Sequence, residues 1–268
     1  MLLDFAKGHG TRNDFVVFAD PDNLVDLTAE QVSFLCDRRG GVGGDGILRA
    51  VRANQVPEWT GVRDVWFMDY RNADGSIAEM CGNGVRVFLR YLEEEGLVAG
   101  ELVRIATRAG LRTGLFLTDG RIAVTMGPAT RGGDVRLTVG SESWPATSVD
   151  VGNPHAVAEL ETDAQLDALD LTAAPTWEPS HAFPNGVNAE FVVREAPGHL
   201  RLRVHERGVG ETESCGTGVV AAAVAAGQSD HCTVEVIGGT LEVDLTGPEA
   251  ILIGPAVVVA RGTCLLPT

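Results

Sequence analysis

Residues 79–85 read Glu-Met-Cys-Gly-Asn-Gly-Val, and residues 213–219 read Glu-Ser-Cys-Gly-Thr-Gly-Val. Both stretches share the pattern Glu-x-Cys-Gly-x-Gly-Val, and each leads into an apolar run typical of a helix. A cysteine at a helix N-terminus is favoured as the thiolate, because the helix dipole places partial positive charge there. Two such thiols, Cys81 and Cys215, predict a pair that faces one site from the two halves of the chain.

Further echoes extend this repeat along the chain. Asn-Asp-Phe at 13–15 has a counterpart in Gly-Asn-Pro-His at 152–155, and Gly-Pro-Ala occurs at both 127–129 and 254–256. The echoes keep their order, as expected for two copies of one unit. We therefore expect an internal duplication in which each half wraps strands around a helix.

The strand and helix patterns support two matched halves. The helix after Cys81 carries a one-sided apolar stripe and should end at Gly96, whereas the helix at 219–226 is apolar all round and should be buried on every side. A further helix should begin at Thr28 with a capping box and end near residues 38–40. Strands are expected at 102–106, 111–117, 121–126, 233–237, 240–245, 250–253 and 256–260, with a hairpin turn at 238–239.

Composition excludes several classes of function. The 268-residue chain is 44% hydrophobic and carries a net charge of −16, so nucleic acid and anionic membranes are poor partners. No apolar run is long enough for a membrane span, and the N-terminus does not resemble a secretory signal. The odd count of five cysteines, without Cys-x-x-Cys, indicates a reducing cytoplasm and no disulfide framework or zinc site. Cys36, Cys232 and Cys264 are interpreted as small buried hydrophobic residues.

Two cofactor signals are weak. Lys7 is the only lysine, so a pyridoxal phosphate Schiff base would depend on it alone. Residues 41–46 satisfy Gly-x-Gly-x-x-Gly, but a predicted helix precedes them where a dinucleotide site needs a strand. We interpret this stretch as a tight glycine loop and expect neither a cofactor nor a metal.

The cysteine motifs themselves indicate a chemistry. Their glycines let backbone amides approach a ligand, and amides at a helix N-terminus bind anions. Two opposed helix starts could hold one carboxylate, with its attached carbon between the two sulfurs. One thiolate could then remove a proton while the partner thiol returns one to the opposite face. From the thiols alone, two buried cysteines or a disulfide between the halves remain open alternatives.

Polar residues around the motifs favour an amino-acid ligand. Asn72 precedes Cys81, Glu206 and Arg207 precede Cys215, and further amides and an imidazole occur at 152–155 and 186–188. Arginine suits a carboxylate, and glutamate and amide oxygens suit an ammonium group. Each asparagine alone is more typical of a turn than of a binding site, and His155 is interpreted as an orienting residue.

Through these residues, the chain resembles the diaminopimelate epimerase family over essentially its whole length. The resemblance rests on residues 9–15, 41–43, 72–75, 81–84, 152–155, 187–188 and 206–218. It implies an α/β (α+β) fold of two pseudo-symmetric domains, each a curled mixed or antiparallel sheet around a central helix. The domains would be 1–130 with Cys81, joined by the last strand at about 258–268, and 131–257 with Cys215, with the active site in the cleft between them.

The resemblance also implies a function and a set of residues. The enzyme would epimerise LL-2,6-diaminopimelate to the meso form without a cofactor, in lysine and peptidoglycan precursor biosynthesis, as a cytoplasmic homodimer. Cys215 would be the proton acceptor and Cys81 the proton donor, with His155 and Glu206 in support. The residues implied to bind substrate are Asn13, Asn72, Gly82, Asn83, Asn153, Asn188, Glu206, Arg207, Gly216 and Thr217. Two departures from the family pattern are Arg12, where glycine is common, and Gly46, where some members have glutamine.

Two rival functions follow from the same residues. Another cofactor-free isomerase of this fold could act on a different amino acid, as proline racemase-like enzymes with two cysteines do. A redox protein could instead switch a Cys81–Cys215 disulfide, although such a protein would not need the set of asparagines.

Overall fold

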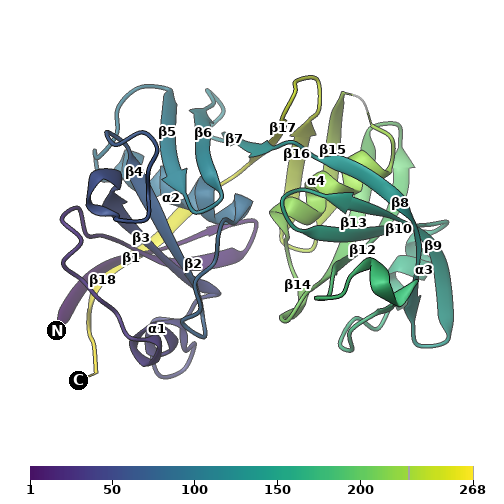
Figure 1. Cartoon of the computed structure of the whole chain (residues 1–268), viewed down its shortest axis with the longest axis horizontal. Coiled ribbons are helices and arrows are strands. Elements are labelled where there is room, and N and C mark those ends of the chain that lie inside the picture. Colours follow the sequence, from purple (N-terminus) through teal and green to yellow (C-terminus); the bar gives the residue numbers. More distant parts are fainter. Residues whose placement is uncertain (229, 268) are drawn as a thin grey trace. The chain divides into compact units, whose positions relative to one another are not determined.

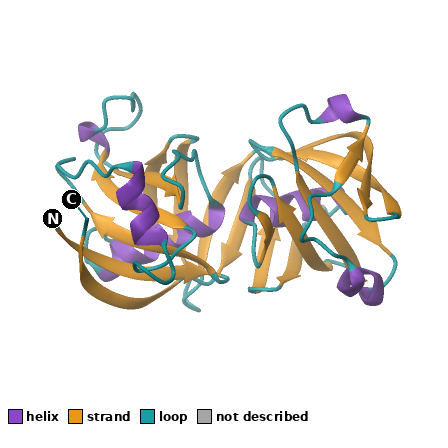
Figure 2. Cartoon of the chain, turned by 90° about the horizontal axis from the view of Figure 1, so that it is seen from below, coloured by secondary structure: helices purple, strands orange, loops and turns teal. Residues whose placement is uncertain are grey.

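The computed structural model describes residues 1–228 and 230–267. It contains two compact units, Met1–Val124 with Gly254–Thr268 and Thr125–Ile253. In Figure 1 the first unit runs from purple to blue and includes the yellow C-terminal strand, and the second is mainly green. Strands dominate both units and helices are few (Figure 2). Among the described residues, no helix has the length and apolar character needed to cross a membrane.

The first unit is built on a mixed sheet whose strands neighbour one another in the order β18-β1-β2-β3-β4-β5-β6-β7. The pairs β2–β3 and β4–β5 are parallel, and the other pairs are antiparallel. The strands are β18 (Val257–Leu265), β1 (Leu2–Gly10), β2 (Asn13–Ala19), β3 (Gly46–Arg52), β4 (Trp66–Asn72), β5 (Leu102–Thr107), β6 (Gly110–Phe116) and β7 (Ile122–Gly127).

The second unit repeats this pairing scheme in the order β8-β9-β10-β12-β13-β15-β16-β17. Its parallel pairs, β10–β12 and β13–β15, occupy the same places as those of the first unit. The predicted duplication is therefore confirmed at the level of the fold. The strands are β8 (Thr130–Val139), β9 (Glu142–Asp150), β10 (Pro154–Leu160), β11 (Thr176–Glu178, on β8), β12 (Asn188–Ala196), β13 (His199–Glu206), β14 (Gly210–Thr212, on β13), β15 (His231–Val236), β16 (Gly239–Asp244) and β17 (Ala250–Gly254).

Each sheet wraps one central helix. Helix α2 (Gly82–Glu94) connects β4 to β5 and packs against β1, β2, β3, β4 and β18. Helix α4 (Gly216–Ala225) lies between β14 and β15 in the chain and packs against β9, β10, β12 and β13 among others. The remaining helices are α1 (Ala29–Cys36), α3 (Asp163–Ala168) and the short 3₁₀ turns η1 (Ala53–Gln55) and η2 (Ser180–Ala182).

The helices follow the sequence with three corrections. The capping box of α1 is present, but the helix ends at Cys36, because Asp37 is extended and its carboxylate accepts the Arg39 and Gly40 amides. Helix α2 is buried on all sides over its first two turns rather than on one stripe, because strands surround it. Helix α4 is buried as predicted, except that its last turn at Val224 and Ala225 is partly exposed.

The predicted strands are present, but one turn and the boundary between the units lie at other residues than predicted. The β15–β16 turn lies at residues 237–238, because Gly239 already pairs with Val236. The expected boundary between residues 130 and 131 falls inside β8, where Arg131 and Asp134 pair with β9 across a bulge. The division between the two units lies at Val124 and Thr125 instead.

Candidate active site

Cys81 and Cys215 occupy equivalent places in the two units. Each is the N-cap residue of its central helix, with the sulfur accepting an amide hydrogen bond from the residue three positions on. The Gly84 N to Cys81 Sγ and Gly218 N to Cys215 Sγ distances are both 3.4 Å. The first amides of a helix have no partner within it. Each helix start therefore combines a thiol with amides suited to an anion.

Cys81 faces an acceptor. Its sulfur lies 3.5 Å from Asn13 Oδ1, at the start of β2, and Asn83 Nδ2 donates to the same oxygen at 3.3 Å. The Asn13 amide nitrogen in turn donates to Asp45 Oδ2 at 2.7 Å. Because a carboxylate only accepts, Asp45 orients Asn13 with its oxygen toward the sulfur. That orientation favours the protonated thiol of Cys81.

The loop that carries Asp45 is tied down by ion pairs. Arg38 bridges Asp14 and Asp45 at 2.7 and 2.8 Å, and Lys7 lies 2.5 Å from Asp14. Burial would raise the pKa of Asp14, but the hydrogen bonds from Arg38 and Lys7 bring it well below its ordinary value. The only lysine is therefore engaged in this cluster, and the glycine loop at 41–46 supports Asn13.

A buried arginine supports the other side of Cys81. Arg86 is completely buried and donates to Asn83 Oδ1 at 2.8 Å and to the carbonyl of Gly82 at 3.3 Å. Burial lowers its pKa to about 10, and the negative charge of a Cys81 thiolate works against that fall. In the described part of the chain it pairs with no carboxylate. Arg86 therefore fixes the Asn83 amide and places a positive charge near Cys81.

Cys215 lies at the end of a hydrogen-bond chain that presents a donor to the sulfur, whereas Cys81 faces an acceptor. Its sulfur is 3.5 Å from Thr217 Oγ1, which accepts from Asn153 Nδ2 at 3.3 Å. Asn153 Oδ1 is 2.9 Å from His155 Nε2, and His155 Nδ1 is 2.6 Å from Glu190 Oε1. The Thr217 hydroxyl hydrogen is left to point at the sulfur, which favours a thiolate there.

The electrostatics of Cys215 correct one expectation. A helix start alone predicts a lowered thiol pKa, but the pKa of Cys215 is raised well above its ordinary value. Burial is the largest cause, followed by the charges of Glu206 and Glu190, which outweigh the hydrogen bonds from Thr217 and Gly218. The cysteine is buried in this structure, so its ionised form loses its solvation by water.

The other predicted site residues lie at the corresponding strand ends. Asn188 begins β12, and its Oδ1 accepts the Arg207 amide at 2.9 Å. Glu206 ends β13 and accepts from Thr212 Oγ1 at 2.5 Å, while the Arg207 side chain is exposed and reaches the carbonyl of Asn185 at 3.4 Å. Asn72 ends β4 and bonds Ser76 within its own turn, the alternative expected for a lone asparagine.

The sequence interpretation missed three residues that contact this set. Glu190 left a signal, because a charged residue interrupts an apolar strand. Arg86 left none, since it lies outside the predicted apolar stripe of its helix, where a charged residue is ordinary. Asp45 left none, since an acidic residue in a glycine loop is ordinary. Its contact with Asn13 depends on β2 and β3 pairing in parallel.

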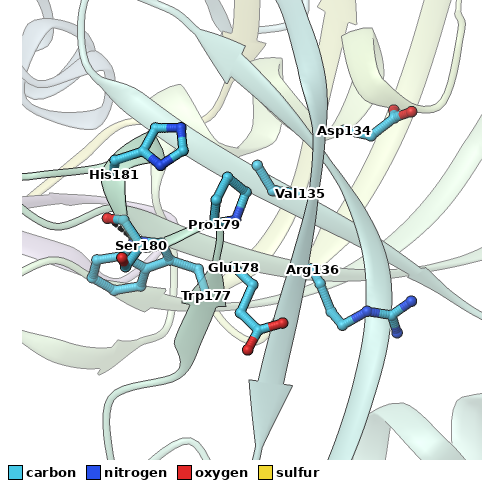
Figure 3. A pocket seen from close by; sticks show the side chains of 8 residues that line it. All are labelled: Asp134, Val135, Arg136, Trp177, Glu178, Pro179, Ser180 and His181. Carbon is cyan, nitrogen blue, oxygen red and sulfur yellow. Dashed lines mark hydrogen bonds between the residues drawn. The ribbon is translucent and has the colours of Figure 1, made fainter.

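A cavity within the second unit has a different lining from these residues. It measures about 740 Å³, is open to solvent and lies along β8 and β11 (Figure 3). Its lining contains none of the predicted site residues: it consists of Asp134, Val135, Arg136, Trp177, Glu178, Pro179, Ser180 and His181. Over the described ranges, one group has its ligand atoms close enough for a metal, Glu195, His199 and Glu235. None of the predicted site residues belongs to it, and its members form partly exposed ion pairs.

Comparison with known proteins identifies relatives that match nearly the whole chain. The family model described as diaminopimelate epimerase matches residues 5–132 and 147–259. The diaminopimelate epimerase of Streptomyces coelicolor is 50% identical, over 97% of this chain and 94% of its own length. Those of Rhodococcus jostii and Thermobifida fusca are both 48% identical, again over 97% of this chain and over 96% and 97% of their own lengths.

Solved structures share the fold at low identity. A phenazine biosynthesis protein of the PhzF family from Bacillus anthracis aligns with a TM-score of 0.73 at 17% identity, over 99% of this chain and 100% of its own. A hydroxyproline epimerase from Agrobacterium vitis aligns with a TM-score of 0.67 at 16% identity, over 98% and 92% of the two chains. At such identities the likeness concerns the fold alone.

Proposed function

The chain belongs to the diaminopimelate epimerase family and is an isomerase, and we propose that it interconverts LL- and meso-2,6-diaminopimelate with Cys81 and Cys215 as the two acid–base groups. The reaction supplies lysine and peptidoglycan precursors. The observation that carries the mechanism is the placement of one cysteine as the N-cap of each central helix, at equivalent points of a duplicated sheet. We propose that the two thiols act on the same substrate carbon.

The proton transfers balance without a cofactor. The Cys215 thiolate removes the α-proton of the LL-substrate, and the Cys81 thiol delivers a proton to the opposite face of the same carbon. The Asn13 acceptor beside Cys81 and the Thr217 donor beside Cys215 support this division of roles. The reverse reaction exchanges them.

The substrate's reacting carboxylate is assigned to the helix starts. Amides at Gly82, Asn83, Gly216 and Thr217 would bind it and stabilise the charge that develops when the α-proton leaves. An α-proton is far less acidic than a thiol, so this preorganised stabilisation and the exclusion of water must lower the barrier. The substrate's ammonium group at the reacting carbon also brings a positive charge toward Glu206 and Cys215. That charge lowers the pKa of Cys215, which burial and nearby carboxylates raise.

The remaining polar residues are assigned to the rest of the substrate. Asn13, Asn72, Asn153, Asn188, Glu206 and Arg207 would hold its amines and its distal carboxylate. His155 and Glu206 would also maintain the catalytic geometry. Arg207 supports this assignment because its exposed guanidinium forms no ion pair within the residues that the structure covers.

Solvent isotope exchange tests the two-base mechanism. In deuterium oxide, the wild-type enzyme should incorporate deuterium at one α-carbon of LL-diaminopimelate while forming the meso isomer. Cys81→Ala and Cys215→Ala should each lose epimerisation by at least about 10³-fold, as expected when an essential acid or base is removed. Cys264→Ala, a partly exposed thiol outside the site, is the control. Wild-type turnover in either site variant would disprove the mechanism.

We also propose a cytoplasmic homodimer. All five cysteines are free thiols, which suits a reducing compartment.

The paired strands β1 and β18 carry exposed apolar side chains that could form the dimer interface, including Leu2 and its register partner Leu265, with Val259 further along β18. Sedimentation of the wild type should give a dimer, and Val259→Asp should shift it toward monomer.

A further inference from the structure

Glu190 is a buried carboxyl group that the mechanism above does not use. It lies in β12, beside β10, and its side chain is completely buried. Oε1 is 2.6 Å from His155 Nδ1, while Oε2 has no hydrogen-bond partner among the described residues. A buried ionised carboxylate with one bare oxygen is costly, whereas the carbonyl oxygen of a neutral acid loses less.

Glu190 also lies against the first turn of α4. A Cβ placed on Gly218 would be 2.8 Å from Glu190 Oε1 and 3.3 Å from Cys215 Sγ. Glycine at this position therefore lets the carboxyl group approach the helix start. The negative charges nearby are those of Glu206 and of Cys215 as a thiolate, and both oppose ionisation of Glu190. His155 is the group that favours it.

The hydrogen-bond chain determines where one proton lies. Asn153 turns its nitrogen to Thr217, so its oxygen faces His155 Nε2 and requires a proton on that nitrogen. Between His155 Nδ1 and Glu190 Oε1 there is then a single proton. Burial raises the pKa of Glu190 more than His155 lowers it, and Glu206 adds to the rise. The buried Oε2 without a hydrogen-bond partner among the described residues and the raised pKa of Glu190 both favour the proton on Glu190.

We propose that Glu190 is a positioning residue that remains protonated and donates to His155 Nδ1, which holds the Nε2–H tautomer and directs the donors of Asn153 and Thr217 toward the Cys215 sulfur. The proposal rests on Cys215 acting as the base. A neutral Glu190 also keeps a second negative charge away from the thiolate. If Glu190 were ionised, His155 could carry its proton on Nδ1 instead. The hydrogen bonds through Asn153 and Thr217 could then run in the opposite direction.

Three variants distinguish a protonated Glu190 from an ionised one. Glu190→Gln places an amide donor where the acid donated, so kcat and its pH profile should stay within about threefold of the wild type. Glu190→Leu removes the donor, so kcat should fall by roughly 10²-fold with KM little changed, because the tautomer is no longer held. Glu195→Gln, an exposed carboxylate at the end of the same strand, should change neither. A Glu190→Gln enzyme as impaired as Glu190→Leu, or with a displaced pH profile, would overturn the proposal.

Spectroscopy of the resting wild-type enzyme gives a readout that does not depend on turnover. The infrared difference between wild type and Glu190→Gln should contain the carbonyl stretch of a protonated carboxylic acid. Nitrogen NMR of labelled histidine should show His155 as the Nε2–H tautomer. A carboxylate band or an Nδ1–H tautomer would refute the proposal even if the enzyme works through Cys215. Loss of the two-base mechanism would instead appear as turnover by Cys215→Ala, with these spectra unchanged.

Discussion

Arg12 adopts a backbone conformation that ordinary side chains rarely take. Its φ is +65°, and that of Thr11 before it is +49°, in the turn between β1 and β2. A left-handed residue with a side chain costs about 1–2 kcal/mol. This explains why glycine is common here in the family that the sequence resembles. The presence of Arg12 instead of glycine therefore lowers the stability of the turn that leads into Asn13.

Replacing Arg12 by glycine should therefore stabilise the protein. Arg12→Gly relieves the steric cost but increases the entropy of the unfolded chain, so we expect a net gain of up to about 1 kcal/mol in the free energy of unfolding. Urea denaturation measures it. Arg39→Gly, at an exposed turn position without a positive φ, should give no gain. Equal gains from both variants would rule out the conformational explanation.

Arg207 offers a residue-scale test of the substrate. Its removal should lower kcat/KM for diaminopimelate by roughly 10- to 100-fold, because one charge-assisted hydrogen bond to the distal carboxylate is lost. The side chain is exposed, so the thermal midpoint of Arg207→Ala should stay near that of the wild type. Arg201→Ala, which loses only surface ion pairs with Asp163 and Asp167, is the activity control. Unchanged turnover would indicate a substrate without a distal carboxylate.

At the scale of elements, the two central helices share a motif but differ in their surroundings. Both carry glycine three positions after the N-cap cysteine, Gly84 in α2 and Gly218 in α4. A Cβ at Gly84 would meet its nearest neighbours at 3.4 Å, an ordinary contact. The same atom at Gly218 would approach Glu190 Oε1 to 2.8 Å. Both units carry the glycine, but a carboxyl group lies against it in the second unit.

The two glycines should therefore respond differently to alanine. Gly84→Ala should leave the free energy of unfolding unchanged or raise it by up to about 1 kcal/mol, because alanine favours a helix. Gly218→Ala should lower it by about 1–3 kcal/mol through overpacking, and should also reduce kcat by displacing Glu190. Chemical denaturation and initial rates measure both. The expectation fails if Gly218→Ala is as well tolerated as Gly84→Ala.

At the scale of the molecule, the first unit is discontinuous in sequence and the second is continuous. Strand β18 returns from the C-terminus to pair with β1. Its approach also supplies carbonyl acceptors to α2, from Pro255 to Arg86 and from Ala256 to Arg90. The second sheet is formed by residues that lie between β7 and β18 in the chain. The two halves therefore depend differently on the C-terminal segment.

This difference predicts the behaviour of fragments. Residues 125–253 expressed alone should show cooperative unfolding in urea, because their sheet and central helix are complete. Residues 1–124 should not, because β1 is left as an open edge and Arg86 loses an acceptor. Adding a peptide of residues 254–268 should restore cooperative unfolding to 1–124. A stable 1–124 fragment without the peptide would contradict this account.

Local patterns were sufficient for much of this architecture. The Thr28 capping box, the glycines that end α2 and α4, and the alternation of the strands all depend on neighbours in sequence, so they were predictable to within a few residues. The expected boundary between residues 130 and 131 differs from the structure because β8 continues across it, with a bulge between Arg131 and Asp134. The burial of α2 on all sides depends on β18, which the stripe of the helix does not reveal.

The sequence by itself determined the repeated motif, the family and the place of each cysteine at a helix start, because these follow from residue types at short spacing. Only the tertiary structure decided the polarity around the sulfurs. Asp45 turns an acceptor toward Cys81, while Glu190 and His155 direct donors toward Cys215. Burial and nearby carboxylates also raise the pKa of Cys215, where the helix start alone predicted a fall. Hydrogen-bond direction and desolvation depend on groups that are distant in sequence, which is why the motif could not reveal them.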